Sequence, residues 1–103
     1  MADPNDVAQA PQQRVHAVVH GMVQGVSFRG YTVLEAKRLG LVGWVKNNRD
    51  STVETVAEGS REQLEAYVDF LHVGSPSARV ERVEVTWQEA NGDLDSFDVR
   101  YSW

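Results

Sequence analysis

Residues 14–40 read RVHAVVHGMVQGVSFRGYTVLEAKRLG, and the spacing of their apolar residues changes partway along the stretch. Between Val15 and Val19 the apolar residues occupy alternate positions, which is the period of a strand with one buried face. From Phe28 onward they recur every three or four positions, as on one face of a helix, and Gly40 is a typical helix stop. The stretch therefore predicts a strand, a loop and a helix in direct succession.

The middle of the chain predicts a hairpin and a second helix. LVGWVKNN (41–48) and STVETVAEG (51–59) are β-rich and are joined by a polar segment of hairpin length. We expect these two strands to pair antiparallel. Ser60 and Gln63 form a capping box at the start of the helix, and GSP (74–76) ends it.

Two alternating segments close the chain, ARVERVEVTW (78–87) and FDVRY (97–101), with ANGD (90–93) in the turn between them. The order of elements is β, α, β, β, α, β, β, without an internal repeat. The simplest packing of this order places two helices on one face of an antiparallel sheet of four to five strands. The sequence therefore predicts an α+β, ferredoxin-like split-βαβ sandwich.

The length of 103 residues is enough for one small domain. We expect this domain to span residues 14–103 and to follow a flexible tail, residues 1–13. The tail sequence MADPNDVAQAPQQ is polar, contains two prolines and has no periodicity. A partner-binding tail is a less favoured interpretation of the same composition.

Charge and residue usage exclude several classes of protein. A net charge of −5 argues against binding to nucleic acid or to an anionic membrane, because both need clustered Lys and Arg. The absence of cysteine excludes a disulfide, a thiolate nucleophile and a Cys-ligated zinc site. No apolar run is long enough to span a bilayer, and the N-terminus lacks the features of a signal peptide. We therefore expect a cytoplasmic protein, and we expect a monomer.

GMVQGVSFRG (21–30), which joins the first strand to the first helix, has the features of an anion site. The first N–H groups of a helix are unpaired and electropositive, so Arg29 in the first turn is unfavourable unless an anion binds there. Gly21 and Gly25 permit the unusual dihedral angles of a loop whose N–H groups converge, and a guanidinium matches two phosphate oxygens. The pattern predicts a site for one phosphoryl group. By spacing alone, a structural turn with a surface arginine explains it equally well.

Motifs for other ligands are missing. The sequence contains neither GxxxxGK[ST] for nucleoside triphosphates nor GxGxxG for dinucleotides. His16 and His20 share the strand face that points away from the helices, where a half-exposed polar pair is favoured over a metal site. His72, near the end of the second helix, should interact favourably with that terminus. We expect no metal ion.

Five segments resemble the acylphosphatase family in order and spacing: VHGMVQGVSFR (19–29), LGLVGWVKN (39–47), VETVAEG (53–59), GSP (74–76) and FDV (97–99). The resemblance extends over everything after the tail. It implies a hydrolase that acts on an acid anhydride, the carboxyl–phosphate bond of acyl phosphates such as carbamoyl phosphate or 1,3-bisphosphoglycerate. The products would be a carboxylate and inorganic phosphate, and no cofactor would be needed.

The resemblance also implies roles for particular residues. Arg29 and the loop backbone would bind the phosphoryl group, and Asn47 would position the attacking water. The loop residues concerned are Gly21, Met22, Val23, Gln24, Gly25, Val26 and Ser27. Two positions depart from the family pattern. Met22 stands where a basic residue is common, and Ser51 stands where the hairpin usually has glycine, so that turn should take a different or slightly strained form.

Asn47 suits this chemistry as a neutral amide, since it can orient a water molecule but cannot take its proton. Asn is also common in turns such as NNRD (47–50), but the GWVKN context favours the functional role. The leaving carboxylate has a conjugate-acid pKa of about 4 and departs without a general acid. No sequence feature predicts a pocket for the acyl group, so we expect the enzyme to accept many acyl phosphates.

The sequence alone leaves two other functions open. A non-catalytic regulatory module could keep the phosphate cradle and bind an anion without turnover, although the presence of both Arg29 and Asn47 counts against it. RNA-recognition domains share this order of strands and helices. The chain lacks their paired aromatic motif and is acidic, so the sequence disfavours RNA binding.

Overall fold

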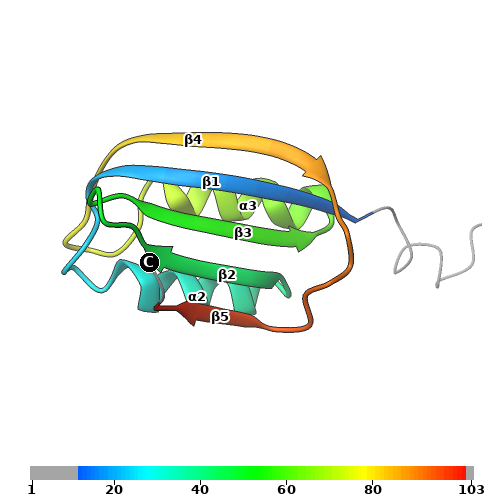
Figure 1. Cartoon of the computed structure of the whole chain (residues 1–103). Helices are drawn as coiled ribbons and strands as arrows, with labels where there is room; N and C mark the ends of the chain where they lie inside the picture. Colours follow the sequence, from blue (N-terminus) through cyan, green and yellow to red (C-terminus); the bar gives the residue numbers. More distant parts are fainter. Residues whose placement is uncertain (1–11, 102–103) are drawn as a thin grey trace, which may run out of the picture.

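The computed structural model describes residues 12–101, which form one sheet with two helices on one face (Figure 1). The elements follow the predicted order: β1 (Gln13–Met22), α2 (Phe28–Arg38), β2 (Val42–Asn47), β3 (Val53–Gly59), α3 (Arg61–Leu71), β4 (Arg79–Glu89) and β5 (Phe97–Arg100). Residues 1–11 of the predicted tail lie outside the described part. The tail prediction is wrong at Gln13, which is the first residue of β1 and pairs with Gly59.

The strands of the sheet lie in the order β4-β1-β3-β2-β5. β1 is antiparallel to both β3 and β4, and β2 pairs antiparallel with β3, which confirms the predicted hairpin. Helices on one face of this sheet confirm the ferredoxin-like α+β class. The sheet is not antiparallel throughout, because β5 runs parallel to β2 at one edge, with Gly43 opposite Phe97.

The segment that contains ANGD (90–93) carries the chain across the end of the sheet, from β4 at one edge to β5 at the other (Figure 1). Glu58 on β3 holds this crossover in place. Its carboxylate accepts hydrogen bonds from the N–H groups of Asn91 at 3.2 Å and Gly92 at 3.3 Å, and from Arg14 at 2.8 Å. Burial raises the pKa of Glu58, but these hydrogen bonds outweigh burial and keep that pKa below its usual value. The predicted turn is therefore part of a crossover and not of a hairpin.

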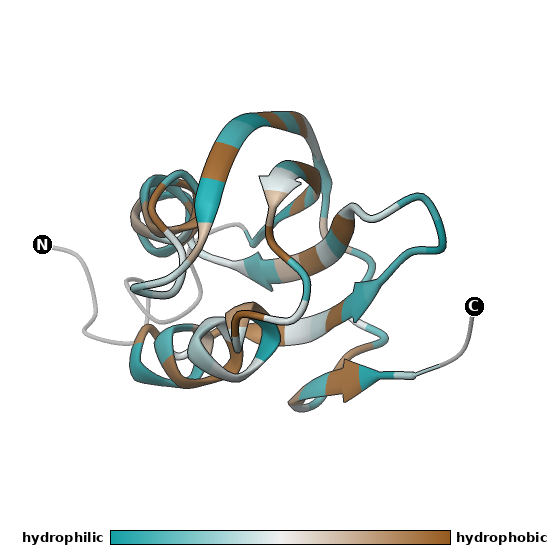
Figure 2. Cartoon of the chain, turned by 90° about the vertical axis from the view of Figure 1, so that its left-hand side faces the viewer, coloured by the Kyte–Doolittle hydropathy of each residue, from teal (hydrophilic) through white to brown (hydrophobic). Residues whose placement is uncertain are grey.

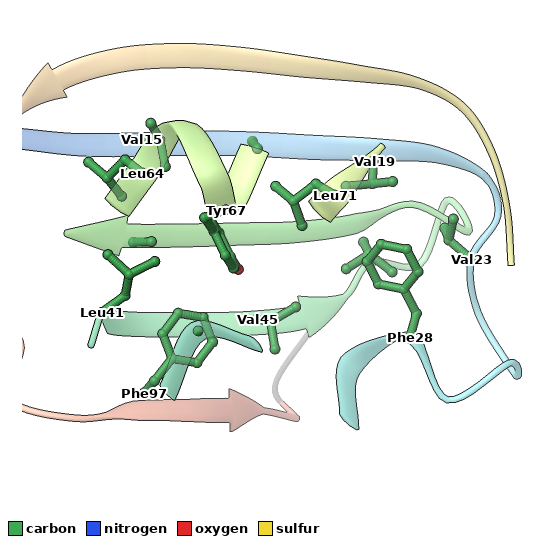
Figure 3. Close-up of a cluster of buried hydrophobic side chains, with 14 residues drawn as sticks. Val15, Val19, Val23, Phe28, Leu41, Val45, Leu64, Tyr67, Leu71 and Phe97 are labelled. Atoms are coloured by element: carbon green, nitrogen blue, oxygen red, sulfur yellow. The ribbon is translucent and has the colours of Figure 1, made fainter. Parts of the chain in front are cut away.

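The core lies between the sheet and the two helices, which are on the same side of the sheet in Figure 2. On β1 the side chains of Val15, Ala17 and Val19 are fully buried, as the alternation in the sequence predicts. The helices add the largest of the side chains that are fully buried (Figure 3), namely Phe28, Leu64, Tyr67 and Leu71. Each such side chain contributes about 1.5–3 kcal/mol to the stability of the fold. No helix within residues 12–101 is long and apolar enough to cross a membrane.

Candidate active site

Segments that are distant in sequence meet at one end of the molecule, the left-hand end in Figure 1 and the end that faces the viewer in Figure 2. Between them lies a cavity of about 390 Å³. This volume falls in the range of about 300–1,000 Å³ that is typical of small-molecule sites. The β1–α2 loop and the start of α2 contribute Val23, Gly25, Ser27, Phe28, Arg29 and Gly30. Asn47 at the end of β2 and Val99 and Tyr101 at the end of β5 complete the lining.

The structure thus brings both predicted site residues, Arg29 and Asn47, to one cavity. Three of the seven predicted loop residues also line it, namely Val23, Gly25 and Ser27. The other four, Gly21, Met22, Gln24 and Val26, are not among the lining residues. Gly21, Gln24 and Val26 instead fix the shape of the loop.

Buried side chains hold the loop at both ends. Val23 and Phe28 are each 1% exposed and point into the core (Figure 3). Between them, Gly25 and Ser27 have positive φ angles of 75° and 62°. Left-handed residues within such a turn let successive N–H groups form an anion-binding concavity. At Gly21 a Cβ would lie 2.1 Å from a backbone oxygen of β4, so the loop leaves the sheet where no larger residue fits.

Three side-chain hydrogen bonds, two from Gln24 and one from Ser75, also fix the loop. Gln24 Nε2 donates to the carbonyl oxygens of Asn48 at 2.8 Å and Thr52 at 2.9 Å, which ties the loop to the β2–β3 turn. Ser75, which is 2% exposed, donates through Oγ to the carbonyl oxygen of Val26 at 2.6 Å. Neither tether was predicted from the sequence. There Gln24 was expected to bind phosphate only through its backbone, and the segment around Ser75 was expected only to end a helix.

The two helices begin in opposite ways. At the start of α3, Ser60 Oγ accepts the Gln63 N–H at 3.1 Å, the Gln63 side chain returns a hydrogen bond at 2.8 Å, and Glu62 adds an acid. At the start of α2, the Ser27 side chain makes no capping hydrogen bond, and the first turn has no acid. The helical hydrogen bonds begin at Tyr31, whose N–H donates to Ser27 O at 3.1 Å. The preceding N–H groups have no partner within the helix and keep their positive potential.

Arg29 adds a cation to this end of α2. Within residues 12–101 it forms no ion pair, and it is the one charged residue among those that line the cavity. Its guanidinium carbon lies 5.2 Å from the centre of the Tyr101 ring. Arg61 in the first turn of α3 is different, because it pairs with Glu65 at 2.8 Å and stacks on Trp87 at 3.6 Å. Arg29 therefore keeps its guanidinium available for an anion.

Asn47 is the last residue of β2 and lies opposite Val53, so it belongs to the strand and the turn begins at Asn48. Its Oδ1 atom is buried and has no hydrogen-bond partner among the described residues. An acceptor left in this state costs about 1–3 kcal/mol. The position is therefore suited to a donor that arrives with a ligand or with water.

The two departures from the family pattern have different consequences. Ser51 has a φ of 75°, which confirms that the turn is strained at this residue. Asp50 supports the turn, because its carboxylate accepts hydrogen bonds from the Thr52 hydroxyl at 2.6 Å and the Thr52 N–H at 3.1 Å. Both hydrogen bonds lower the pKa of Asp50, and the bond from the Thr52 hydroxyl has the larger effect. Met22 is 63% exposed and lies outside the cavity lining, so it leaves the cavity itself unchanged.

The histidines lie elsewhere. His16 Nε2 is 2.6 Å from Glu54 and His20 Nε2 is 3.1 Å from Glu84, so each has its own carboxylate partner on the open face of the sheet. His72 Nδ1 is 2.9 Å from a carbonyl oxygen in the last turn of α3, as expected for its position. Within residues 12–101, no group of three or more His, Cys, Asp or Glu side chains could hold a metal ion.

Comparison with known proteins identifies the family. A protein-family model for acylphosphatase matches residues 15–99. An acylphosphatase from Anaeromyxobacter sp. (strain Fw109-5) is 51% identical over 88 residues, which cover 85% of this chain and 95% of that protein. An acylphosphatase from Thermococcus kodakarensis is 50% identical over 86 residues, with 84% and 93% covered.

A solved structure agrees with these sequence matches. The crystal structure of acylphosphatase from Bacillus subtilis is similar to this fold with a TM-score of 0.84 and 36% sequence identity. The similarity covers 86% of this chain and 99% of that one. The chain therefore belongs to the acylphosphatase family, enzymes that hydrolyse acyl phosphates.

Proposed function

We propose that the cavity is the active site, in which Arg29 and the β1–α2 loop hold the phosphoryl group and Asn47 holds the water that attacks phosphorus. One observation carries this proposal. The uncapped, positively charged start of α2 belongs to the same cavity as the Oδ1 atom of Asn47, which has no hydrogen-bond partner within residues 12–101. Such an arrangement offers charge for an anion on one side and an acceptor for a water hydrogen on the other.

The phosphoryl group is held by charge and by geometry. Phosphoryl transfer places negative charge on three equatorial oxygens in the transition state, and positioned donors stabilise that charge. The free N–H groups at the start of α2 and the planar fork of Arg29 supply such donors. Because Val23, Phe28 and the Gln24 tether fix the loop beforehand, its donors need little reorganisation during the reaction.

Asn47 orients the nucleophile. When its Oδ1 atom accepts a hydrogen bond from water, a lone pair of the water oxygen is free to point at phosphorus. The new O–P bond forms while the bond from phosphorus to the bridging oxygen breaks, and the electron pair leaves with the carboxylate. The proton of the attacking water passes to the phosphate product and the solvent, since an amide cannot take it. The products are a carboxylate and inorganic phosphate, and the reaction needs no cofactor.

Release of benzoate from benzoyl phosphate, measured in the presence of a chelator, tests the proposal. Arg29→Ala should lower kcat/KM by about 10³-fold or more, and Asn47→Ala by about 10²-fold. Arg49→Ala is the matched control, because Arg49 is exposed, carries the same charge and lies outside the cavity. Full activity in both site variants would overturn the assignment. Phosphate binding without turnover by the wild-type protein would instead favour the regulatory module.

The site of attack can be read from the products. In water enriched in ¹⁸O, attack on phosphorus places the label in inorganic phosphate after a single turnover. Attack on the carbonyl carbon would place the label in benzoate. Label in benzoate would contradict the role of the Arg29 cavity as a phosphoryl site.

A further inference from the structure

Part of the cavity wall has no role in binding a phosphoryl group or a water molecule. The loop, Arg29 and Asn47 account for the polar part of the lining. Val99 and Tyr101 form an apolar section on the side of β5. A site that takes a phosphoryl group alone has no need of such a wall, because apolar surface neither compensates charge nor donates hydrogen bonds.

The parallel pairing of β5 with β2 brings this wall to the site. Lys46 lies opposite Arg100, so the next residue of each chain segment, Asn47 and Tyr101, reaches the same cavity. The Tyr101 ring extends from there to α2, where it faces the guanidinium of Arg29 with its centre 5.2 Å from the guanidinium carbon. The ring therefore borders the place where we position the phosphoryl group.

Tyr101 is the last residue that the structure describes, and its side chain is largely exposed. Its exposure of 76% is higher than that of any other large hydrophobic residue in the described part of the chain. The side chain buries little against the protein, although an aromatic ring can bury about 150–250 Å². One face lies over Arg29, and Tyr101 lines the cavity, where its ring can contact a ligand.

We propose that Tyr101, together with Val99, forms a subsite for the acyl group and makes the enzyme prefer acyl phosphates with a flat aromatic acyl group. This inference rests on the proposed function, since it assumes that the phosphoryl group lies at Arg29. The acyl carbon is joined to phosphorus through a single bridging oxygen, so the acyl group must lie beside the phosphoryl site. The Tyr101 ring adjoins that site through its contact with Arg29. Under this proposal the enzyme distinguishes between acyl groups, whereas the sequence led us to expect that it accepts many acyl phosphates alike.

The test compares kcat/KM for benzoyl phosphate and acetyl phosphate in the full chain and its variants. The intrinsic reactivities of the two substrates are the same for every variant, so a change in their ratio isolates the contact with the acyl group. Tyr101→Ala should lower the ratio of kcat/KM for benzoyl phosphate to that for acetyl phosphate by about three- to tenfold. A change of this size corresponds to the free energy of one aromatic contact. Tyr101→Phe keeps the ring and should stay within about twofold of the wild type.

Tyr31→Ala is the matched control, because Tyr31 is an exposed tyrosine on α2 that does not line the cavity. It should leave the ratio unchanged. An active wild type whose ratio is the same in Tyr101→Ala would overturn the subsite alone. Equal losses on both substrates would overturn it as well, because the ring would then act through Arg29 and not on the acyl group. A wild type inactive on both substrates would overturn the proposed function and the subsite together.

Discussion

Gln24 connects the two halves of the proposed site, and its removal should damage stability and catalysis together. Its amide nitrogen donates to the carbonyl oxygens of Asn48 and Thr52, the residues that flank the turn after Asn47. Each neutral hydrogen bond of this kind contributes about 0.5–1.5 kcal/mol, so Gln24→Ala should cost about 1–3 kcal/mol of unfolding free energy. A loss of this size corresponds to a fall in Tm of roughly 5–20 °C for a domain of this length.

The same substitution should lower kcat. Without the tether, the loop that we propose to bind the phosphoryl group and the turn beside Asn47 can move apart, and a misplacement of about 1 Å costs up to about 10²-fold in rate. Gln24→Glu tests the tether more strictly. The substitution keeps the shape of the side chain but places a carboxylate oxygen, which cannot donate, next to two carbonyl oxygens. It should be the more damaging of the two, and it should also weaken phosphate binding.

Urea unfolding followed by tryptophan fluorescence and initial rates with benzoyl phosphate would measure both effects. Gln88→Ala on the exposed face of β4 is the matched control. If Gln24→Ala matched this control in both measurements, the tether would have no energetic role. If Gln24→Ala lost stability but kept its kcat, the coupling to Asn47 would be refuted.

Three further substitutions test the scaffold of the fold by urea unfolding. Ser51→Gly should stabilise the protein by about 0.5–1 kcal/mol, because relief of a left-handed serine exceeds the entropy cost of glycine; a loss of stability would contradict the strain. Gly74→Ala should destabilise by about 2 kcal/mol or more, since its Cβ would lie 2.3 Å from the Phe28 ring at a φ of 71°; an unchanged midpoint would show that the ring moves aside freely. Glu58→Gln should cost about 1–3 kcal/mol at pH 7 through its bond to Arg14. Because the folded-state pKa of Glu58 is lowered, this contribution is complete above the unfolded pKa and is lost as pH falls through the folded value, so the variant and wild type should converge in acid.

Local patterns were sufficient to predict the elements and to place Arg29 at the start of a helix after a glycine-containing loop, whereas the role of Asn47 came from the resemblance to the family and stays a prediction. The alternation in β1, the capping box at Ser60 and the uncapped helix start at Arg29 all depend on residues close in sequence. The predicted strain at Ser51 came from the comparison with the family pattern, which usually has glycine at that turn position. Such features are visible because backbone preferences act over a few residues.

Contacts between distant segments could not be predicted in this way. The turn residues of ANGD (90–93) indicate a change of direction but not the edge of the sheet to which the chain returns. Glu58, 33 residues before Asn91, holds that segment as a crossover. The Ser75 tether and the approach of Tyr101 to Arg29 likewise depend on the finished fold. A single hydroxyl or ring has no periodicity that would reveal its partner.

The proposal that Arg29 binds the phosphoryl group and Asn47 positions the water can be tested most directly by measuring phosphate binding and turnover on the same preparations. Calorimetric titration with inorganic phosphate measures the affinity of the loop and Arg29 for phosphate. Hydrolysis of benzoyl phosphate measures the turnover of the complete site. Asn47→Ala should bind phosphate within about threefold of the wild type while losing most of its turnover, because it removes only the water contact. Arg29→Ala should lose both. Contradiction would come from an Asn47→Ala protein that keeps its turnover, or from one that loses phosphate affinity to the same extent as Arg29→Ala.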